Sequence, residues 1–401
     1  MTDKTSQSTP EQSAKGPAVT GTPAYAAART VDFSEIPVID LAAMNTPEGE
    51  AKVAETLVKT ASEIGFFYVS GHGIPPTLSA RAMAASRAFF ALDEAAKSDI
   101  TIDSHQRGWM AQGLANLEGA ATHDAKEVFF WGREVAPDDA DVLAGLPLVH
   151  PNQWPDRTAP FLREGILPYY EAVMALGLRI LTCLAKGLGA DPDIFVRAYD
   201  RPLGRGQLVY YPALGEEDVA AQRFGAAEHS DFGVLTILKQ DNLGGLQVRN
   251  RSDEWIEAMP IEDTFVCNIG DLLERWTNGR LVSTPHRVLN RSGKSRFSIP
   301  IFCDPSSDAM VDPRDFDPEA DINILPPIAA GPYIASKNRR NFSHTRLKGV
   351  EARADLRCPR GWDQGELPCQ TSFLRPSSGH FRSPVTCRSA TGSIPRVSAA
   401  R

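Results

Sequence analysis

Two histidines and an aspartate stand in a pattern that can bind a divalent metal ion. His229 and Asp231 are separated by one residue, and His286 follows later in the chain. Two imidazoles and one carboxylate form the facial triad that holds Fe(II) and leaves three positions of an octahedron open. Because side chains two residues apart on a strand point to the same face, His229 and Asp231 are expected to reach one ion together. The pattern therefore predicts an Fe(II) site with room for O2 and an organic ligand.

An arginine and a serine with the same two-residue spacing follow His286. Arg296 and Ser298 would share one face of a strand. A guanidinium group binds a carboxylate through two parallel hydrogen bonds and does not lose its charge, and a hydroxyl can add a further bond. We therefore expect this pair to bind a carboxylate of the organic ligand.

The candidate ligands lie on or beside segments that have the composition of strands. Apolar and β-branched residues follow Asp231, and similar residues follow His286 and Arg296. We expect strands at residues 66–70, 207–212, 233–239, 244–249, 264–269, 286–290 and 296–302. Helices are expected before these strands. Thr46 can cap a helix over residues 47–64 that has Pro47 at its first position, and a long apolar helix is expected over 161–188.

With these segments in place, the chain resembles the isopenicillin N synthase-like family of Fe(II)- and 2-oxoglutarate-dependent dioxygenases. The matching motifs occur in the family's order over roughly residues 34 to 336, and their joint pattern is far more specific than any one of them. They are residues 36–40 (IPVID), 65–74 (GFFYVSGHGI), 107–109 (RGW), 126–129 (KEVF), 210–212 (YYP), 229–231 (HSD), 244–248 (GGLQV), 268–271 (NIGD), 278–279 (NG), 285–287 (PHR) and 296–298 (RFS).

The resemblance implies a fold, a reaction and a set of site residues. The fold would be α+β, a double-stranded β-helix (a distorted jelly roll) flanked by N-terminal helices. The enzyme would use Fe(II), O2 and 2-oxoglutarate to hydroxylate, desaturate or cyclise a small molecule, and it would release succinate and CO2. The implied metal ligands are His229, Asp231 and His286, and the implied contacts of 2-oxoglutarate are Arg296, Ser298 and Tyr211.

Two other functions fit the same residues. Isopenicillin N synthase and aminocyclopropane-carboxylate oxidase use the same triad without 2-oxoglutarate, and in them the Arg-x-Ser pair can serve another carboxylate. The chain could also be a catalytically inactive metal-binding member of the family, although its intact set of site residues argues against decay. Formation of succinate from 2-oxoglutarate, with and without candidate substrates, separates these functions.

The substrate is expected to contact the N-terminal half of the chain and its loops. In the family, such walls lie around residues 107–109, 126–131 and 275–276. An arginine or lysine there would suit an acidic substrate, but a single charged residue is more often solvated at the surface, and the match at 126–129 fits a structural role equally well. We expect a small molecule because no module for recognising macromolecules is attached.

Composition indicates a cytoplasmic enzyme, for which we expect a monomer. The 401 residues are 42% hydrophobic, which suffices for a large core. Six cysteines without paired spacing argue against a disulfide framework, and the net charge of −8 gives no reason to expect nucleic acid as a partner. No membrane span or signal peptide is expected, because residues 176–190 are interrupted by Arg179 and Lys186 and the first residues lack an apolar run.

The charge divides the chain into unequal parts. Residues 338–401 carry twelve Lys and Arg against four Asp and Glu, a net +8, whereas residues 1–337 carry 30 against 46, a net −16. We therefore predict a basic C-terminal tail at 338–401 after a jelly-roll core at 201–337. A helical N-terminal region of the oxygenase is predicted at 31–200, after a disordered segment at 1–30 that is rich in Thr, Ser, Ala, Gly and Pro.

Three interpretations of the tail remain open. It can be a disordered extension, including one produced by an altered reading frame, because its basic and weakly apolar composition offers little core. It can be a nucleic-acid-binding arm, although its arginines are scattered and lack interleaved aromatic residues. A zinc site formed by Cys358, Cys369, Cys387 and His380 is the least favoured, because the cysteines lack the short spacing of structural zinc modules.

Overall fold

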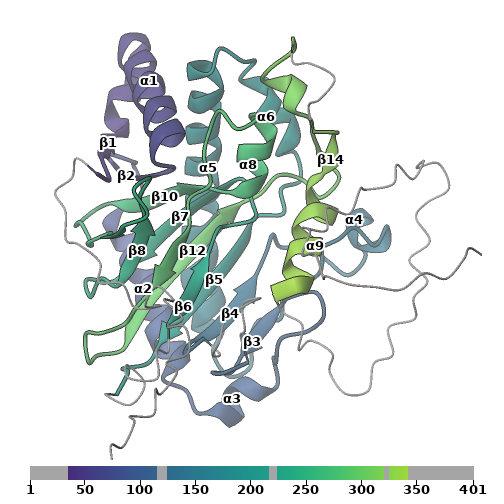
Figure 1. The fold of residues 1–401 in the computed structure, drawn as a ribbon. Helices are drawn as coiled ribbons and strands as arrows, with labels where there is room; N and C mark the ends of the chain where they lie inside the picture. The colour runs from purple at the N-terminus through teal and green to yellow at the C-terminus, as the bar shows by residue number, and fades with distance from the viewer. Residues whose placement is uncertain (1–34, 115–123, 216–223, 320–324, 342–401) are drawn as a thin grey trace, which may run out of the picture. The chain divides into compact units, whose positions relative to one another are not determined.

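An eight-stranded sheet lies at the centre of the fold (Figure 1). The structure is a computed structural model and describes residues 35–114, 124–215, 224–319 and 325–341. The β1–β2 pair is parallel, and the other pairs in this sheet are antiparallel. The strand order is β1 (Val38–Asp40), β2 (Phe66–Ser70), β10 (Phe265–Ile269), β7 (Leu235–Gln240), β12 (Arg296–Cys303), β5 (Arg205–Tyr211), β4 (Glu127–Trp131) and β3 (Gly108–Met110).

A smaller, four-stranded antiparallel sheet packs against one face of the large sheet. Its order is β6 (Ala226–His229), β11 (His286–Val288), β8 (Leu246–Arg249) and β9 (Trp255–Glu257). One apolar cluster joins the two sheets, because it contains Val209 and Val266 from the large sheet and Leu246 and Val288 from the small one. Two sheets around a shared core form a distorted jelly roll, so the expected fold class is confirmed.

Helices cover the opposite face of the large sheet. The three longest are α1 (Pro47–Glu63), α2 (Pro76–Phe90) and α5 (Pro160–Gly187), and they share a second apolar cluster with that face. Alternation along β4 shows how one strand contributes side chains to both apolar clusters. Phe129 and Trp131 belong to the helix-side cluster, whereas Val128 and Phe130 belong to the cluster between the sheets.

The two helices with sequence signals form as expected. In α1 the Thr46 hydroxyl accepts a hydrogen bond from the Gly49 N–H at 3.1 Å, and Pro47 stands in the first turn. Helix α5 matches the segment expected over residues 161–188. The shorter elements are η1 (Leu41–Asn45), α3 (Glu94–Ser98), α4 (Ala140–Leu143), α6 (Asp193–Ala198), α8 (Asp271–Trp276), β13 (Met310–Val311), η2 (Pro313–Asp315), β14 (Ile328–Ala329) and α9 (Ala330–Asn341).

Helix α5 corrects the expectation that no segment reaches the length of a membrane span. By length and composition alone, it is the one helix among the described residues that could cross a membrane. Half of its most apolar stretch is buried inside the protein, where it packs against α1, α2 and β12. A central helix of a folded core must also be long and apolar.

The strands correct two further expectations. The region predicted to be helical, 31–200, also supplies β1, β3 and β4 to the large sheet, besides the expected strand β2. Strand β6 was not expected, because its sequence Ala-Ala-Glu-His has little β-propensity. The predicted domain boundaries stay predictions, and α9 continues through residue 337. The segment 1–30 and all four residues of the suggested zinc site lie outside the described residues.

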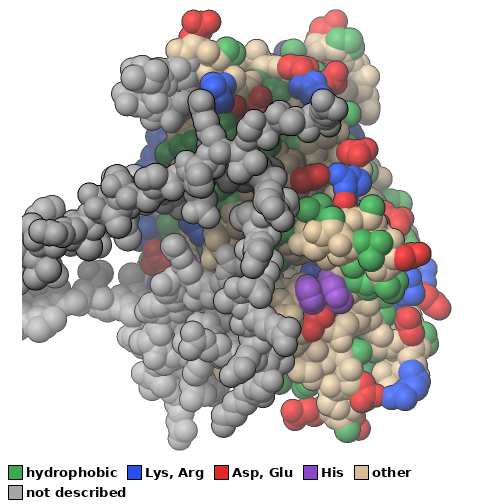
Figure 2. Space-filling view, turned by 90° about the vertical axis from the view of Figure 1, so that its right-hand side faces the viewer, with side chains coloured by type: hydrophobic (Ala, Val, Ile, Leu, Met, Phe, Trp, Pro, Cys, Tyr) green, Lys and Arg blue, Asp and Glu red, His purple; other side chains and the backbone are tan. Residues whose placement is uncertain are grey.

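The surface of the described residues mixes both signs of charge. On the face shown in Figure 2, acidic and basic side chains are interspersed rather than gathered by sign. Charged side chains of the described residues form ion pairs, such as Arg201 with Asp308 at 2.9 Å and Lys186 with Glu50 at 2.7 Å. Such pairs are solvated and contribute little to stability.

Candidate metal centre and its pocket

The two sheets bring His229, Asp231 and His286 together. His229 ends β6 and His286 begins β11, and the two are direct partners across the antiparallel pair. One ligand atom from each of the three residues lies within 4.8 Å of the others. The imidazole centroids are 4.3 Å apart, and His286 Nε2 lies 3.9 Å from Asp231 Oδ1. Three such atoms converging on one point can hold a single metal ion.

Asp231 reaches this point from a loop, so the expectation that it shares a strand with His229 is wrong. Strand β6 ends at His229, and β7 begins only at Leu235. The Asp231 carbonyl accepts the Asp271 N–H at 2.7 Å, which fixes the loop against the start of α8. This approach requires a glycine at residue 270, because a Cβ there would lie 2.2 Å from the Gly233 carbonyl oxygen.

Backbone carbonyls orient both imidazoles for metal binding. His229 Nδ1 donates to the carbonyl of Ala227 at 2.7 Å, and His286 Nδ1 donates to that of Thr284 at 3.2 Å. A carbonyl can only accept, so each Nδ1 carries a proton, and Nε2 is the ring nitrogen left for a metal ion. Burial and the neighbouring His286 lower the pKa of His229 to about 4. The His229 ring is thus held in the neutral form that binds a metal ion.

The carboxylate of Asp231 is held through one of its oxygens. Oδ2 accepts hydrogen bonds from the Thr236 hydroxyl at 2.5 Å and from the Asn268 amide at 2.7 Å. Thr236 on β7 and Asn268 on β10 are partners in register, so neighbouring strands supply both donors. Burial alone would raise the pKa of Asp231, but the two imidazoles and these two bonds together hold it below its ordinary value. Oδ1 remains available to a metal ion.

Arg296 stands in the same pocket with one nitrogen unpaired. Its Nε donates to the Gly244 carbonyl at 2.7 Å, and Nη2 donates to Gln240 Oε1 at 3.2 Å. The side chain is 1% exposed, and among the described residues its buried Nη1 has no hydrogen-bond partner. A buried cationic donor without a partner is costly unless a ligand supplies the acceptor. The arginine therefore fits the carboxylate of an organic ligand.

The other two expected contacts of this ligand also line the pocket. Tyr211 is the register partner of Arg296 across β5 and β12, and its ring centre lies 4.8 Å from the guanidinium carbon. Ser298 is 2% exposed and follows Arg296 on the same face of β12. The pocket is also lined by all three candidate metal ligands, so the metal centre and the carboxylate receptor share one cavity.

Several residues of the site were not predicted from sequence. Thr236 and Asn268 hold Asp231, and Gln240 holds Arg296. Lys126, by contrast, belongs to the segment 126–131 that was expected to form a wall, and it lines the pocket. Asn268 and Lys126 lie in motifs that resemble those of the family, but the sequence did not indicate which residue each would contact.

The other walls expected from the sequence have structural roles outside this pocket. Arg107 donates to the Leu148 carbonyl at 2.7 Å, and Trp109 donates to Glu127 at 2.5 Å. Trp276 donates to Asp315 at 2.8 Å. None of these residues lines the pocket that holds the triad.

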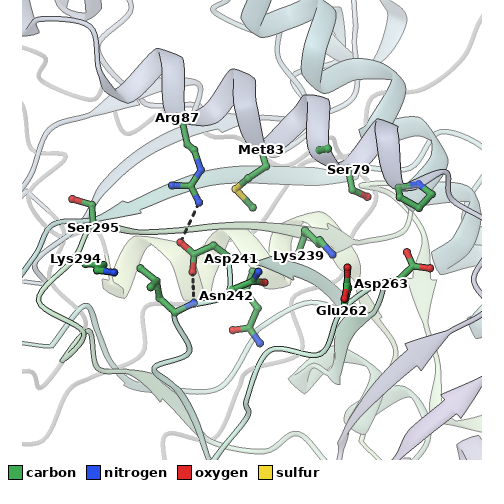
Figure 3. A pocket seen from close by; sticks show the side chains of 14 residues that line it. Ser79, Met83, Arg87, Lys239, Asp241, Asn242, Glu262, Asp263, Lys294 and Ser295 are labelled. Atoms are coloured by element: carbon green, nitrogen blue, oxygen red, sulfur yellow. Dashed lines mark hydrogen bonds and ion pairs between the residues drawn. The ribbon is translucent and has the colours of Figure 1, made fainter.

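A second cavity, of about 750 Å³, lies between α2 and the start of the β7–β8 connection (Figure 3). Arg87 and Asp241 face each other across it, 3.5 Å apart, and Asp241 also accepts the Phe297 N–H at 2.7 Å. Gln240, which holds Arg296, belongs to its lining as well. None of the three triad residues lines this cavity.

Comparison with known families and relatives agrees with this geometry. Residues 36–157 match the family model described as non-haem dioxygenase in morphine synthesis N-terminal, and residues 206–305 match that of the 2OG-Fe(II) oxygenase superfamily. The homoarginine-6-hydroxylase 2-ODD-C23 of Glycine max is 36% identical over 302 residues, which cover 71% of this chain and 89% of the relative. The 2-oxoglutarate-dependent dioxygenase traH of Penicillium crustosum is 34% identical over 304 residues, covering 72% and 91%.

Solved structures show the same likeness. A full-length Neurospora crassa protein crystallised in complex with alpha-KG and thymine superimposes with a TM-score of 0.68 at 27% identity, covering 77% of this chain and 97% of that one. JOX2 in complex with 2OG, Fe and JA gives a TM-score of 0.61 at 28% identity, covering 74% and 83%. Sequence, fold and cofactor chemistry therefore agree that the chain belongs to the Fe(II)- and 2-oxoglutarate-dependent dioxygenases.

Proposed function

We propose that His229, Asp231 and His286 hold the Fe(II) of this enzyme and that Arg296 binds the distal carboxylate of 2-oxoglutarate. The observation that carries the second assignment is the buried, unpaired Nη1 of Arg296 in the cavity that the triad also lines. Ser298 and Tyr211 complete the receptor. Hydroxylation of a small molecule is the default outcome, and desaturation or ring closure needs only a different placement of the substrate.

Each group in the pocket has a defined task in this proposal. Bound Fe(II) activates O2 and couples the conversion of 2-oxoglutarate to succinate and CO2 to oxidation of the substrate. Thr236 and Asn268 fix the Asp231 carboxylate, and the Ala227 and Thr284 carbonyls fix the imidazoles. Gln240 and Gly244 hold the arginine in place before the cosubstrate arrives, which lowers the entropy lost on binding.

Replacing the carboxylate ligand tests this proposal. Asp231→Ala should lose both bound Fe(II) and the formation of succinate from 2-oxoglutarate, because two imidazoles alone hold a first-row divalent ion poorly. Glu228→Ala is a matched control, since Glu228 is an exposed carboxylate on β6 that pairs with Arg249 at 2.8 Å. Stoichiometric iron and turnover in Asp231→Ala would contradict the metal assignment. Turnover of the wild-type enzyme at full rate without 2-oxoglutarate would establish the cosubstrate-independent alternative.

A further inference from the structure

Lys126 reaches the metal pocket because of its position just before β4. Side chains at even-numbered positions of β4, Val128 and Phe130, face the core between the sheets. Lys126 continues this face and lines the pocket of the triad. Its neighbour Glu127 points to the other face, where it accepts hydrogen bonds from Lys97 at 2.7 Å and Trp109 at 2.5 Å. Glu127 therefore has a structural role on the helix side of the sheet.

The lysine brings a partly buried positive charge to the pocket of the metal centre. Its side chain is 16% exposed and pairs with Asp124, whose side chain is 1% exposed, at 2.9 Å. Burial acts to lower the pKa of Lys126, but Asp124 and Tyr211 outweigh this effect and raise it, so the ammonium group stays charged. An ammonium group has three donors, and Asp124 is its ion-pair partner among the described residues.

Asp124 also connects the lysine to the metal ligand His229. Asp124 Oδ1 accepts the Ala227 N–H at 3.0 Å, and the Ala227 carbonyl accepts the proton of His229 Nδ1 at 2.7 Å. One residue of β6 thus holds the Asp124–Lys126 pair on one side and the imidazole on the other. The ion pair with Asp124 therefore ties the lysine that lines the metal pocket to the strand that carries His229.

2-Oxoglutarate does not need this cation. In the proposed function, Arg296 would hold its distal carboxylate, and the metal held by the triad would bind its 2-oxo acid end. Both anionic ends then have partners, and Lys126 remains free to serve another ligand in the same cavity. A fixed cation in a secluded pocket favours an anionic acceptor over a neutral one.

We propose that Lys126 binds a carboxylate of the prime substrate and thereby selects small carboxylic acids over their neutral analogues. This inference rests on the proposed function and names the substrate class of that site. Lys126 is a substrate-binding residue in this proposal, and Asp124 is the positioning residue that holds it.

The test uses matched pairs of acids and amides with the full-length Fe(II) enzyme. Benzoate, phenylacetate, cinnamate and hexanoate, each beside its primary amide, are titrated anaerobically into the Fe(II)·2-oxoglutarate complex, with the charge-transfer absorption of that complex as the signal. At least one acid should perturb the signal at roughly tenfold lower concentration than its amide, the ratio expected from one charge-assisted contact. Lys126→Arg should keep this preference, and Lys126→Met should lose it.

Two further variants separate binding from folding. Lys126→Met leaves the Asp124 carboxylate buried without its partner, so the double variant Lys126→Met/Asp124→Asn removes both charges and should also lose the preference while staying folded. Lys52→Met, at an exposed position of α1, is the control for the same substitution and should bind like the wild type.

Three results would overturn the inference. They are a panel in which no acid is preferred over its amide, a preference that survives in Lys126→Met, and a tenfold loss of affinity for 2-oxoglutarate in that variant, which would assign the lysine to the cosubstrate. Failure of the proposed function looks different, because the wild-type protein would then form no charge-transfer complex with Fe(II) and 2-oxoglutarate at all.

Discussion

Removing the hydrogen bonds that hold Asp231 should weaken metal binding without removing a ligand. Thr236 and Asn268 both donate to Oδ2 and leave Oδ1 toward the two imidazoles. Thr236→Val deletes the hydroxyl and keeps the branched shape, and Asn268→Leu deletes the amide at similar volume. In each variant the carboxylate keeps its charge but loses part of what fixes its orientation.

The contacts set the size of the effect. A hydrogen bond to a charged group contributes about 1.5–3 kcal/mol, and about 1.4 kcal/mol corresponds to a tenfold change in a binding constant. Each substitution should therefore lower metal affinity roughly 10- to 100-fold, the range typical for partners of metal ligands. The two effects should not simply add, because both donors act on the same oxygen.

Anaerobic calorimetric titration with Fe(II) measures these affinities directly. Thr264→Val is the matched control, since Thr264 is also a buried threonine, just before β10, and its hydroxyl donates to the Ile261 carbonyl at 2.9 Å. It does not line the metal pocket, so it should bind Fe(II) like the wild type. Metal affinity that is unchanged in both Thr236→Val and Asn268→Leu would refute the argument that Oδ2 is the held oxygen and Oδ1 the ligand.

Two other substitutions test the receptor and the core. Arg296→Lys keeps the charge but cannot reproduce the bonds to Gly244 and Gln240, so the affinity for 2-oxoglutarate should fall roughly tenfold or more in a cosubstrate titration, and an unchanged affinity would remove Arg296 from the receptor. Lys97→Met leaves the Glu127 carboxylate buried without its cation, so it should lower the free energy of unfolding, measured in urea, by about 3–5 kcal/mol. A loss smaller than that of the control Lys52→Met would show that the hydrogen bond from Trp109 alone satisfies the carboxylate.

Much of the fold follows from short-range patterns. Every strand expected from apolar and β-branched composition is present, and Thr46 caps α1 as its sequence predicts. Among the strands that were not expected, β6 has a weak local signal. Strand β6 is Ala-Ala-Glu-His, and its pairing comes from its neighbour β11 rather than from its own residues. Tertiary contacts decide such segments, and one sequence does not display them.

The chemistry of the site was readable from residue types, but its geometry was not. Two imidazoles, a carboxylate and an arginine identify the ligands, because few other side chains can do this work. The two-residue spacing suggested one strand for His229 and Asp231, whereas the chain turns between them and Asp231 is fixed by the start of α8. A spacing limits which atoms can meet, and the path between them depends on distant residues.

Lys126 and Glu127 show how the alternation of side chains along a strand separates residues that are adjacent in sequence. Lys126 and Glu127 look like one charged pair in the sequence, yet alternation sends them to opposite faces of the large sheet. Parity could have been read from Val128 to Trp131, where apolar residues fill both faces. The sequence does not show what each face packs against, because this depends on β4 lying beside β5 and on the small sheet covering one side of the large sheet. The glutamate is therefore explained by packing. The lysine, whose ion-pair partner among the described residues is Asp124, is the charge that we propose meets a substrate.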